Sequence, residues 1–201
     1  MTSSRALTKR NSVIFVTELK FEFIFRFIVS SSINVNFMNW AYIHLVINHF
    51  PIIGVIIGTA LLSAGVIFKN QGVTISGLGT IVFASLMAIV AYMTGDPAEG
   101  VAKGLPDVAR SLISRHENIA TVGMYLMVTA GLLAGSSLFS IWKKDKSIRL
   151  LIILTLAFSL ISSGTMVYIG RTGGQIRHTE FRNDATKQYI LEHQNDKVDD
   201  D

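Results

Sequence analysis

Four long apolar blocks dominate the sequence of this chain. They cover about residues 42–68, 73–93, 118–142 and 150–170. Each block is near the roughly 20 residues that an α-helix needs to cross about 30 Å of hydrocarbon. Half of the 201 residues are hydrophobic and only 16% are charged, which is typical of a chain that folds in lipid. The sequence therefore predicts an all-α integral membrane protein, an up-and-down bundle of four transmembrane helices.

The segments on either side of these blocks differ from them in composition. Residues 1–37 mix aromatic and charged side chains, which disfavours a membrane span. We interpret them as an N-terminal extension outside the folded domain or as a targeting segment, and we expect the working protein to begin at Met38. The folded domain is predicted to cover residues 38–182. Residues 183–201 are polar and acidic at the end, which predicts a mobile tail.

Prolines and glycines indicate where the helices begin and end. Proline fits the first turn of a helix and is costly inside one, so we expect the regular helix of the first span to begin at Pro51. The sequence Asp96-Pro97-Ala98-Glu99 resembles a capping box and predicts a short interfacial helix between spans two and three. Gly173-Gly174 predicts a turn after the fourth span.

The residue types that are absent restrict the chemistry. The chain has no cysteine, which excludes disulfides, thiolate metal sites, iron–sulfur clusters and covalently attached haem. Histidine, methionine and carboxylates are left as ligands. The net charge of +4 is modest, so we expect the lipid bilayer, and no nucleic acid, as a partner. No nucleophile–base arrangement, phosphate loop or pair of acids favours a hydrolase.

The order in which the four spans cross the membrane is expected to place four histidines at one membrane face. The basic loop 143–149 follows span three, and the positive-inside rule predicts that it faces the cytoplasm of a bacterium, across its inner membrane. His44 and His49 precede span one, His116 precedes span three and His178 follows span four. An even number of crossings then brings all four to one face, predicted to be periplasmic together with the C-terminus.

Haem b is the cofactor that we expect at this face. It needs two neutral imidazoles from different helices. His44 and His49 are five residues apart, about 140° around a helix, so they cannot bind one iron from the same side. The favoured pair is therefore His49 with either His116 or His178, which leaves His44 for a second site or a hydrogen bond. The basic residues expected to pair with the anionic propionates are Arg115, Arg171 and Arg177.

Two other readings of the same histidines stay open. The first is a protein that binds or transports a copper or zinc ion through His44, His49, His116 and His178. The carboxylates that could complete such a site are Asp96, Glu99 and Glu117. The second is a structural subunit without a cofactor, in which the histidines donate hydrogen bonds to loop backbone.

Several short segments carry a resemblance that covers about residues 39–182. They are Asn39-Trp40-Ala41-Tyr42-Ile43-His44-Leu45-Val46-Ile47-Asn48-His49-Phe50-Pro51, Thr94-Gly95-Asp96-Pro97-Ala98-Glu99, His116-Glu117 and Thr172-Gly173-Gly174-Gln175-Ile176-Arg177-His178. With these segments the chain resembles a bacterial group of small, uncharacterised four-span membrane proteins. That group is similar to domains of unknown function suggested to be cytochrome b-like. The resemblance implies the four-span fold and leaves the chemistry to the residues.

The working hypothesis is a bis-histidine, b-type membrane cytochrome. It would relay electrons at the outer face of the inner membrane, as a partner or subunit of a redox chain. Redox proteins or quinol are the expected partners, and the oligomeric state is left open. This predicts an electron-transfer or accessory subunit more than a stand-alone enzyme.

Overall fold

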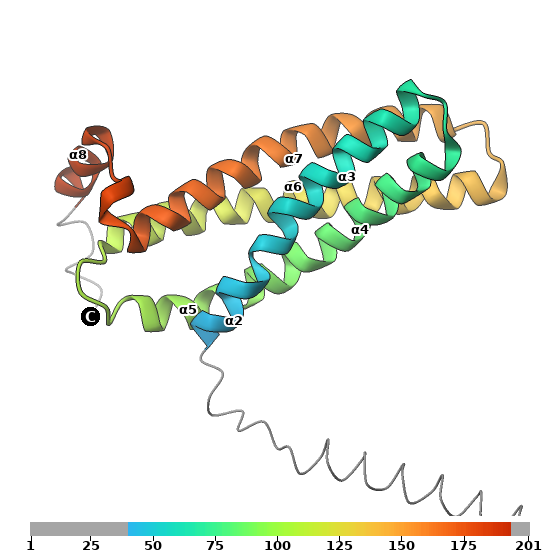
Figure 1. The fold of residues 1–201 in the computed structure, drawn as a ribbon. Helices are drawn as coiled ribbons and strands as arrows, with labels where there is room; N and C mark the ends of the chain where they lie inside the picture. Colours follow the sequence, from blue (N-terminus) through green and yellow to red (C-terminus); the bar gives the residue numbers. More distant parts are fainter. Residues whose placement is uncertain (1–39, 194–201) are drawn as a thin grey trace, which may run out of the picture. The chain divides into compact units, whose positions relative to one another are not determined.

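A computed structural model describes residues 40–193 of the chain (Figure 1). Within this range, four helical segments are long and apolar enough to cross a membrane. The prediction of an all-α membrane protein with four spans is therefore confirmed. The predictions for residues 1–37 and for the end of the tail, residues 194–201, lie outside the described residues.

The first span is broken one turn before its proline. It consists of α2, Trp40–Ile47, and α3, His49–Ile67, with Asn48 between them. Pro51 is the third residue of α3 and is buried, so the prediction that the helix begins at Pro51 is wrong by two residues. Proline has no N–H for the carbonyl four residues earlier and its ring clashes with that carbonyl, which here belongs to Ile47. The break after Ile47 is thus the direct effect of Pro51.

Helices α3 and α4 pack at very short range. Helix α4, Gln71–Met93, follows a turn that ends at Asn70, whose side chain accepts a hydrogen bond from the N–H of Val73 at 3.1 Å. A Cβ atom on Gly77 would lie 2.5 Å from the backbone nitrogen of Leu62, and one on Gly58 would lie 3.1 Å from the nitrogen of Ile81. Small residues permit this approach, as is common between membrane helices.

The short helix between spans two and three is present, and its start differs from the predicted one. Helix α5, Gly95–Ala102, follows α4 almost without interruption because Thr94, between them, has helical backbone angles. The side chain of Asp96 is in the first turn, and no side chain caps this helix. The capping box predicted at Asp96 and Glu99 is therefore not formed.

Helices α6 and α7 are longer than the apolar blocks that predicted them. Helix α6 is Arg110–Lys143 and α7 is Ile148–Arg177. The predicted turn at Gly173-Gly174 is wrong, since α7 continues through both glycines. After α7, a 3-10 turn, η2 at Thr179–Phe181, leads to α8, Asp184–Glu192.

The four spans form a closed ring. Helix α3 packs against α4, α4 against α6, α6 against α7, and α7 against α3. The interior combines two apolar clusters with paired hydroxyl groups, among them Ser137 with Thr155 at 3.1 Å and Thr59 with Ser163 at 3.3 Å. Large apolar side chains such as Leu132 point outward, 68% exposed, as expected for a surface that lipid covers. Helices α2, α5 and α8 lie at one end of this bundle (Figure 1).

Candidate functional site

His44 is anchored to the end of the second span. Its Nδ1 atom lies 3.1 Å from the carbonyl oxygen of Ala91 and 3.1 Å from the hydroxyl of Thr94. The Thr94 hydroxyl directs its own hydrogen at the carbonyls of Ala91 and Val90. Both neighbours of Nδ1 are therefore acceptors, and the neutral ring carries its proton on this atom. The lone pair of Nε2 is then free to bind a ligand.

His116 is anchored in the same way to the end of the fourth span. Its Nδ1 atom lies 3.1 Å from the hydroxyl of Thr172, which donates its hydrogen to the carbonyl of Ile169 at 3.0 Å. The threonine oxygen thus accepts from Nδ1–H, and Nε2 keeps its lone pair. The next residue, Gly173, lies against the ring, because a Cβ atom there would be 3.1 Å from Cε1 of His116.

The two anchors repeat one arrangement. In each half of the bundle, a histidine at the start of the first span meets a Thr-Gly pair at the end of the second span. The pairs are Thr94-Gly95 with His44 and Thr172-Gly173 with His116. Both glycines face Cε1 of their histidine, since a Cβ atom on Gly95 would be 4.0 Å from that atom of His44. The two hairpins thus share the same contact between a histidine and a Thr-Gly pair.

His44 and His116 are each held by a threonine at the end of another span, Thr94 and Thr172. The two histidines come from α2 and α6, which are distant in the sequence. The fold therefore brings together two imidazoles whose Nδ1 atoms are held by hydrogen bonds. Metal-binding histidines commonly have their second ring nitrogen fixed in this manner.

His49 and His178 have other surroundings. His49 is exposed on the first turn of α3, and its Nδ1 atom donates to the carbonyl of Leu45 at 2.7 Å. His178 is exposed beyond α7, where its Nδ1 atom lies 2.9 Å from a carboxylate oxygen of Glu180 and its ring leans on Phe181. The geometry thus favours His44 as the partner of His116, where the sequence argument favoured His49.

Two of the three arginines predicted to bind haem propionates contact groups of the protein itself. Arg115 donates to the hydroxyl of Tyr168 at 2.6 Å and lies 4.9 Å above the ring of Tyr189 in α8. Arg177 donates to the carbonyl of Pro106 at 3.4 Å. Arg171 is exposed on α7. The first two therefore fasten α8 and the α5–α6 loop to the bundle.

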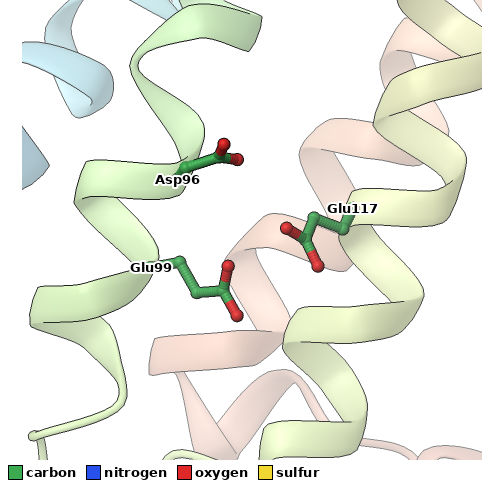
Figure 2. A group of neighbouring side chains, drawn as sticks. All are labelled: Asp96, Glu99 and Glu117. Carbon is green, nitrogen blue, oxygen red and sulfur yellow. The ribbon is translucent and has the colours of Figure 1, made fainter.

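Three carboxylates gather between α5 and α6, in the segments that follow Thr94 and His116 in the sequence. Oxygens of Asp96 and Glu99 in α5 and of Glu117 in α6 all lie within 4.8 Å of one another, and the side chains converge across the gap between the helices (Figure 2). Lys103 partly compensates their charge, because its Nζ atom lies 2.8 Å from Glu99. This hydrogen bond and the negative charge of Glu99 raise the pKa of Lys103 above its ordinary value.

Sequence reasoning missed the two threonines. The signal that could have found them is the repeated Thr-Gly pair at the end of an apolar block, at residues 94–95 and 172–173. No family model, no curated protein and no solved structure matches the chain. The candidate site therefore stands on its own geometry.

Proposed function

We propose that this protein is a b-type cytochrome-like membrane protein whose haem iron is bound between His44 and His116. The observation that carries the proposal is the matched anchoring of the two rings. Thr94 and Thr172 hold the two Nδ1 atoms, and each Nε2 lone pair is left available. Neutral imidazoles from two different helices are the donor set that a bis-histidine haem requires.

A buried polar atom near His44 supports a bound group at this place. Asn48 follows His44 by one helical turn, and its backbone N–H donates to the His44 carbonyl at 2.9 Å. Its Oδ1 atom is buried and has no hydrogen-bond partner in the described part of the chain. Buried acceptors are normally satisfied. A ligand or its bound water beside His44 would supply the missing donor.

The proposed role is electron relay at one face of the membrane. Haem iron supplies one-electron transfer when it is bound. The chain itself contributes the Nε2 atoms of the two histidines and the threonines that fix the orientation of the rings. The helical bundle shields one side of the proposed site from lipid. We place this end of the protein on the periplasmic side of a bacterial inner membrane, with redox proteins or quinol as partners, because loop 143–149 at the other end is basic.

Binding of haem would require the short helices α2 and α5 to change position. The macrocycle is much wider than a pair of rings, and neither of the two grooves described in the bundle, about 680 and 630 Å³, is lined by a histidine. Helices α2 and α5 pack against each other at the end of the bundle. The proposal therefore requires α2 to move away from α5, and the break at Asn48 supplies a hinge for α2.

A second candidate is a copper or zinc ion on the same two imidazoles. The observation that favours it is the cluster of Asp96, Glu99 and Glu117, whose carboxylate oxygens lie within 4.8 Å of one another in the segments that follow Thr94 and His116. Carboxylates and imidazoles together suit zinc and copper(II). Such an ion needs much less room than a haem macrocycle.

An optical spectrum combined with metal analysis of the purified full-length protein decides between these candidates. A Soret band and a pyridine haemochrome spectrum, with about one iron per chain, support haem. A colourless protein with stoichiometric copper or zinc supports the second candidate. The absence of both signals, after expression with added haem precursor and metal salts, contradicts both and favours the structural subunit.

Single substitutions test the ligand pair. We expect His44→Ala and His116→Ala each to abolish the Soret band. His49→Ala is the matched control, because it removes the same ring from an exposed position five residues away, and we expect it to keep the band. Circular dichroism confirms that each variant is helical. A band that disappears in His49→Ala and persists in His44→Ala would restore the pairing expected from the sequence.

A further inference from the structure

A groove of about 680 Å³ opens at the end of the bundle opposite to the histidines. It lies between the α3–α4 turn and the α6–α7 loop. Its rim carries Lys69, Lys144 and Arg149, and its wall is formed by apolar side chains, among them Val66 and Ile153. The groove therefore combines cations at the level of a membrane surface with hydrocarbon below them.

The positive charge of this groove is not neutralised by the described residues. Lys69, Lys144 and Arg149 form no ion pair there, although Asp145 is part of the same lining. The carboxylate of Asp145 accepts a hydrogen bond from the backbone N–H of Ser147 at 2.9 Å, within the α6–α7 loop. Three cations against one acid give the groove a net positive charge.

Two of these cations occupy backbone positions that favour glycine. Lys69 has φ 53° and Lys144 has φ 55°, both in the left-handed region. Lys69 follows the last turn of α3, and Lys144 is the C-cap of α6. At such positions glycine would avoid the steric cost of a Cβ atom. The chain thus has a lysine at both strained turns that flank one groove, and strain of this kind often accompanies binding.

The apolar wall points to a ligand with a hydrocarbon part. Val66 is 42% exposed and Ile153 is 56% exposed, so the wall continues into the outer surface of the bundle that contacts lipid tails. A soluble phosphate compound would use the cations and leave this wall uncovered. Basic pockets between membrane helices bind anionic lipid headgroups by the same combination.

We propose that this groove binds one anionic phospholipid. The phosphate of the headgroup contacts Lys69, Lys144 and Arg149, and an acyl chain lies along Val66 and Ile153. The site is independent of the histidine end and of any cofactor bound there.

Native mass spectrometry of the full-length protein in detergent tests this assignment. The probes are dioleoyl phosphatidylglycerol and dioleoyl phosphatidylcholine, which differ only in the headgroup. We expect one molecule of phosphatidylglycerol to bind more tightly than phosphatidylcholine. Each Lys→Gly substitution at positions 69 and 144 should weaken it about fivefold, as should Arg149→Gln, because a cation near the membrane surface contributes about 1 kcal/mol.

The glycine variants separate binding from folding. Glycine suits the left-handed backbone at both positions, so their melting temperatures in lipid-free detergent should not fall. Lys146→Gln is the matched control, because it removes the same charge from the same loop outside the groove lining. We expect it to bind phosphatidylglycerol as the unmodified protein does.

Three results would overturn the proposal. The first is equal binding of the two lipids, which removes the role of the cations. The second is an equal loss in Lys146→Gln, which reduces the effect to net charge. The third is displacement of the lipid by glycerol 3-phosphate at equal concentration, which shows that the apolar wall contributes nothing and that the site takes soluble phosphates.

Discussion

The Nδ1 atom of His116 lies 3.1 Å from the hydroxyl oxygen of Thr172, which is 56 residues further along the chain. The hydroxyl hydrogen is directed at the carbonyl of Ile169 in its own helix. The contact therefore fixes which nitrogen of the imidazole carries the proton, and it ties the start of α6 to the end of α7.

Replacing Thr172 should weaken ligand binding without unfolding the bundle. Thr172→Val keeps the shape and removes the acceptor of Nδ1–H, so we expect affinity for haem or metal to fall about 10- to 100-fold. Thr172→Ser should retain most of it. The measurement is a titration of the ligand-free protein by absorbance. Thr165→Val is the control, since that hydroxyl donates only to Ile161 of its own helix, and an equal loss there would remove the special role of Thr172.

Substitutions at two glycines of α4 should have opposite effects on stability. Gly77→Ala places a Cβ atom 2.5 Å from a backbone nitrogen of α3, so the helices must move apart, at a cost of about 1–3 kcal/mol. Gly79→Ala has no neighbour within 4 Å and should stabilise the helix by up to about 1 kcal/mol. Thermal unfolding in one detergent compares them. Similar melting temperatures for both variants would contradict the close packing of α3 and α4.

Removing Arg115 should loosen α8. Its guanidinium joins Tyr168 in α7 to Tyr189 in α8, and Arg115→Gln loses both the ion–ring contact and the short hydrogen bond. We expect faster amide hydrogen exchange in residues 184–192, with Arg171→Gln as the exposed control. Unchanged exchange in α8 together with a weaker haem affinity would support the propionate-binding role that the sequence suggested.

The pKa of Glu180 should respond to His178. It is lowered from its ordinary value first by a hydrogen bond from the backbone N–H of Glu180 and then by His178. A lowered carboxyl pKa contributes stability above the ordinary pKa, and this is lost as the pH falls through the lowered value. His178→Gln should raise the pKa of Glu180 only partly, because the backbone hydrogen bond stays. A ¹³C NMR titration of the carboxyl carbon measures it, and an unchanged pKa would contradict the contact.

The spans and the proline break could be predicted from the sequence, because each depends on local physics. Hydrocarbon thickness sets the length of an apolar block, and Pro51 lacks the N–H that the carbonyl of Ile47 needs. The choice between His44 and His49 could not be predicted in this way. It depends on the direction in which α2 leaves α3 at Asn48, and α4 and α5 decide this by packing against α2.

Two other features depended on tertiary contacts. Gly173-Gly174 has the composition of a turn, yet α7 continues through both, and Gly173 lies where the ring of His116 leaves little room for a side chain. The segment after Asn183 is polar enough to predict a mobile tail. Its first part forms α8 because Asn183 caps it, accepting the N–H of Thr186 at 2.9 Å, and Arg115 covers Tyr189.

The division of the site between two hairpins has a consequence for biosynthesis. Residues 40–94 emerge from the ribosome first and already contain His44 with its partner Thr94. The second imidazole arrives only with α6, and its anchor arrives at the end of α7. A nascent chain therefore could not hold the proposed ligand between both anchored imidazoles until the last span has docked.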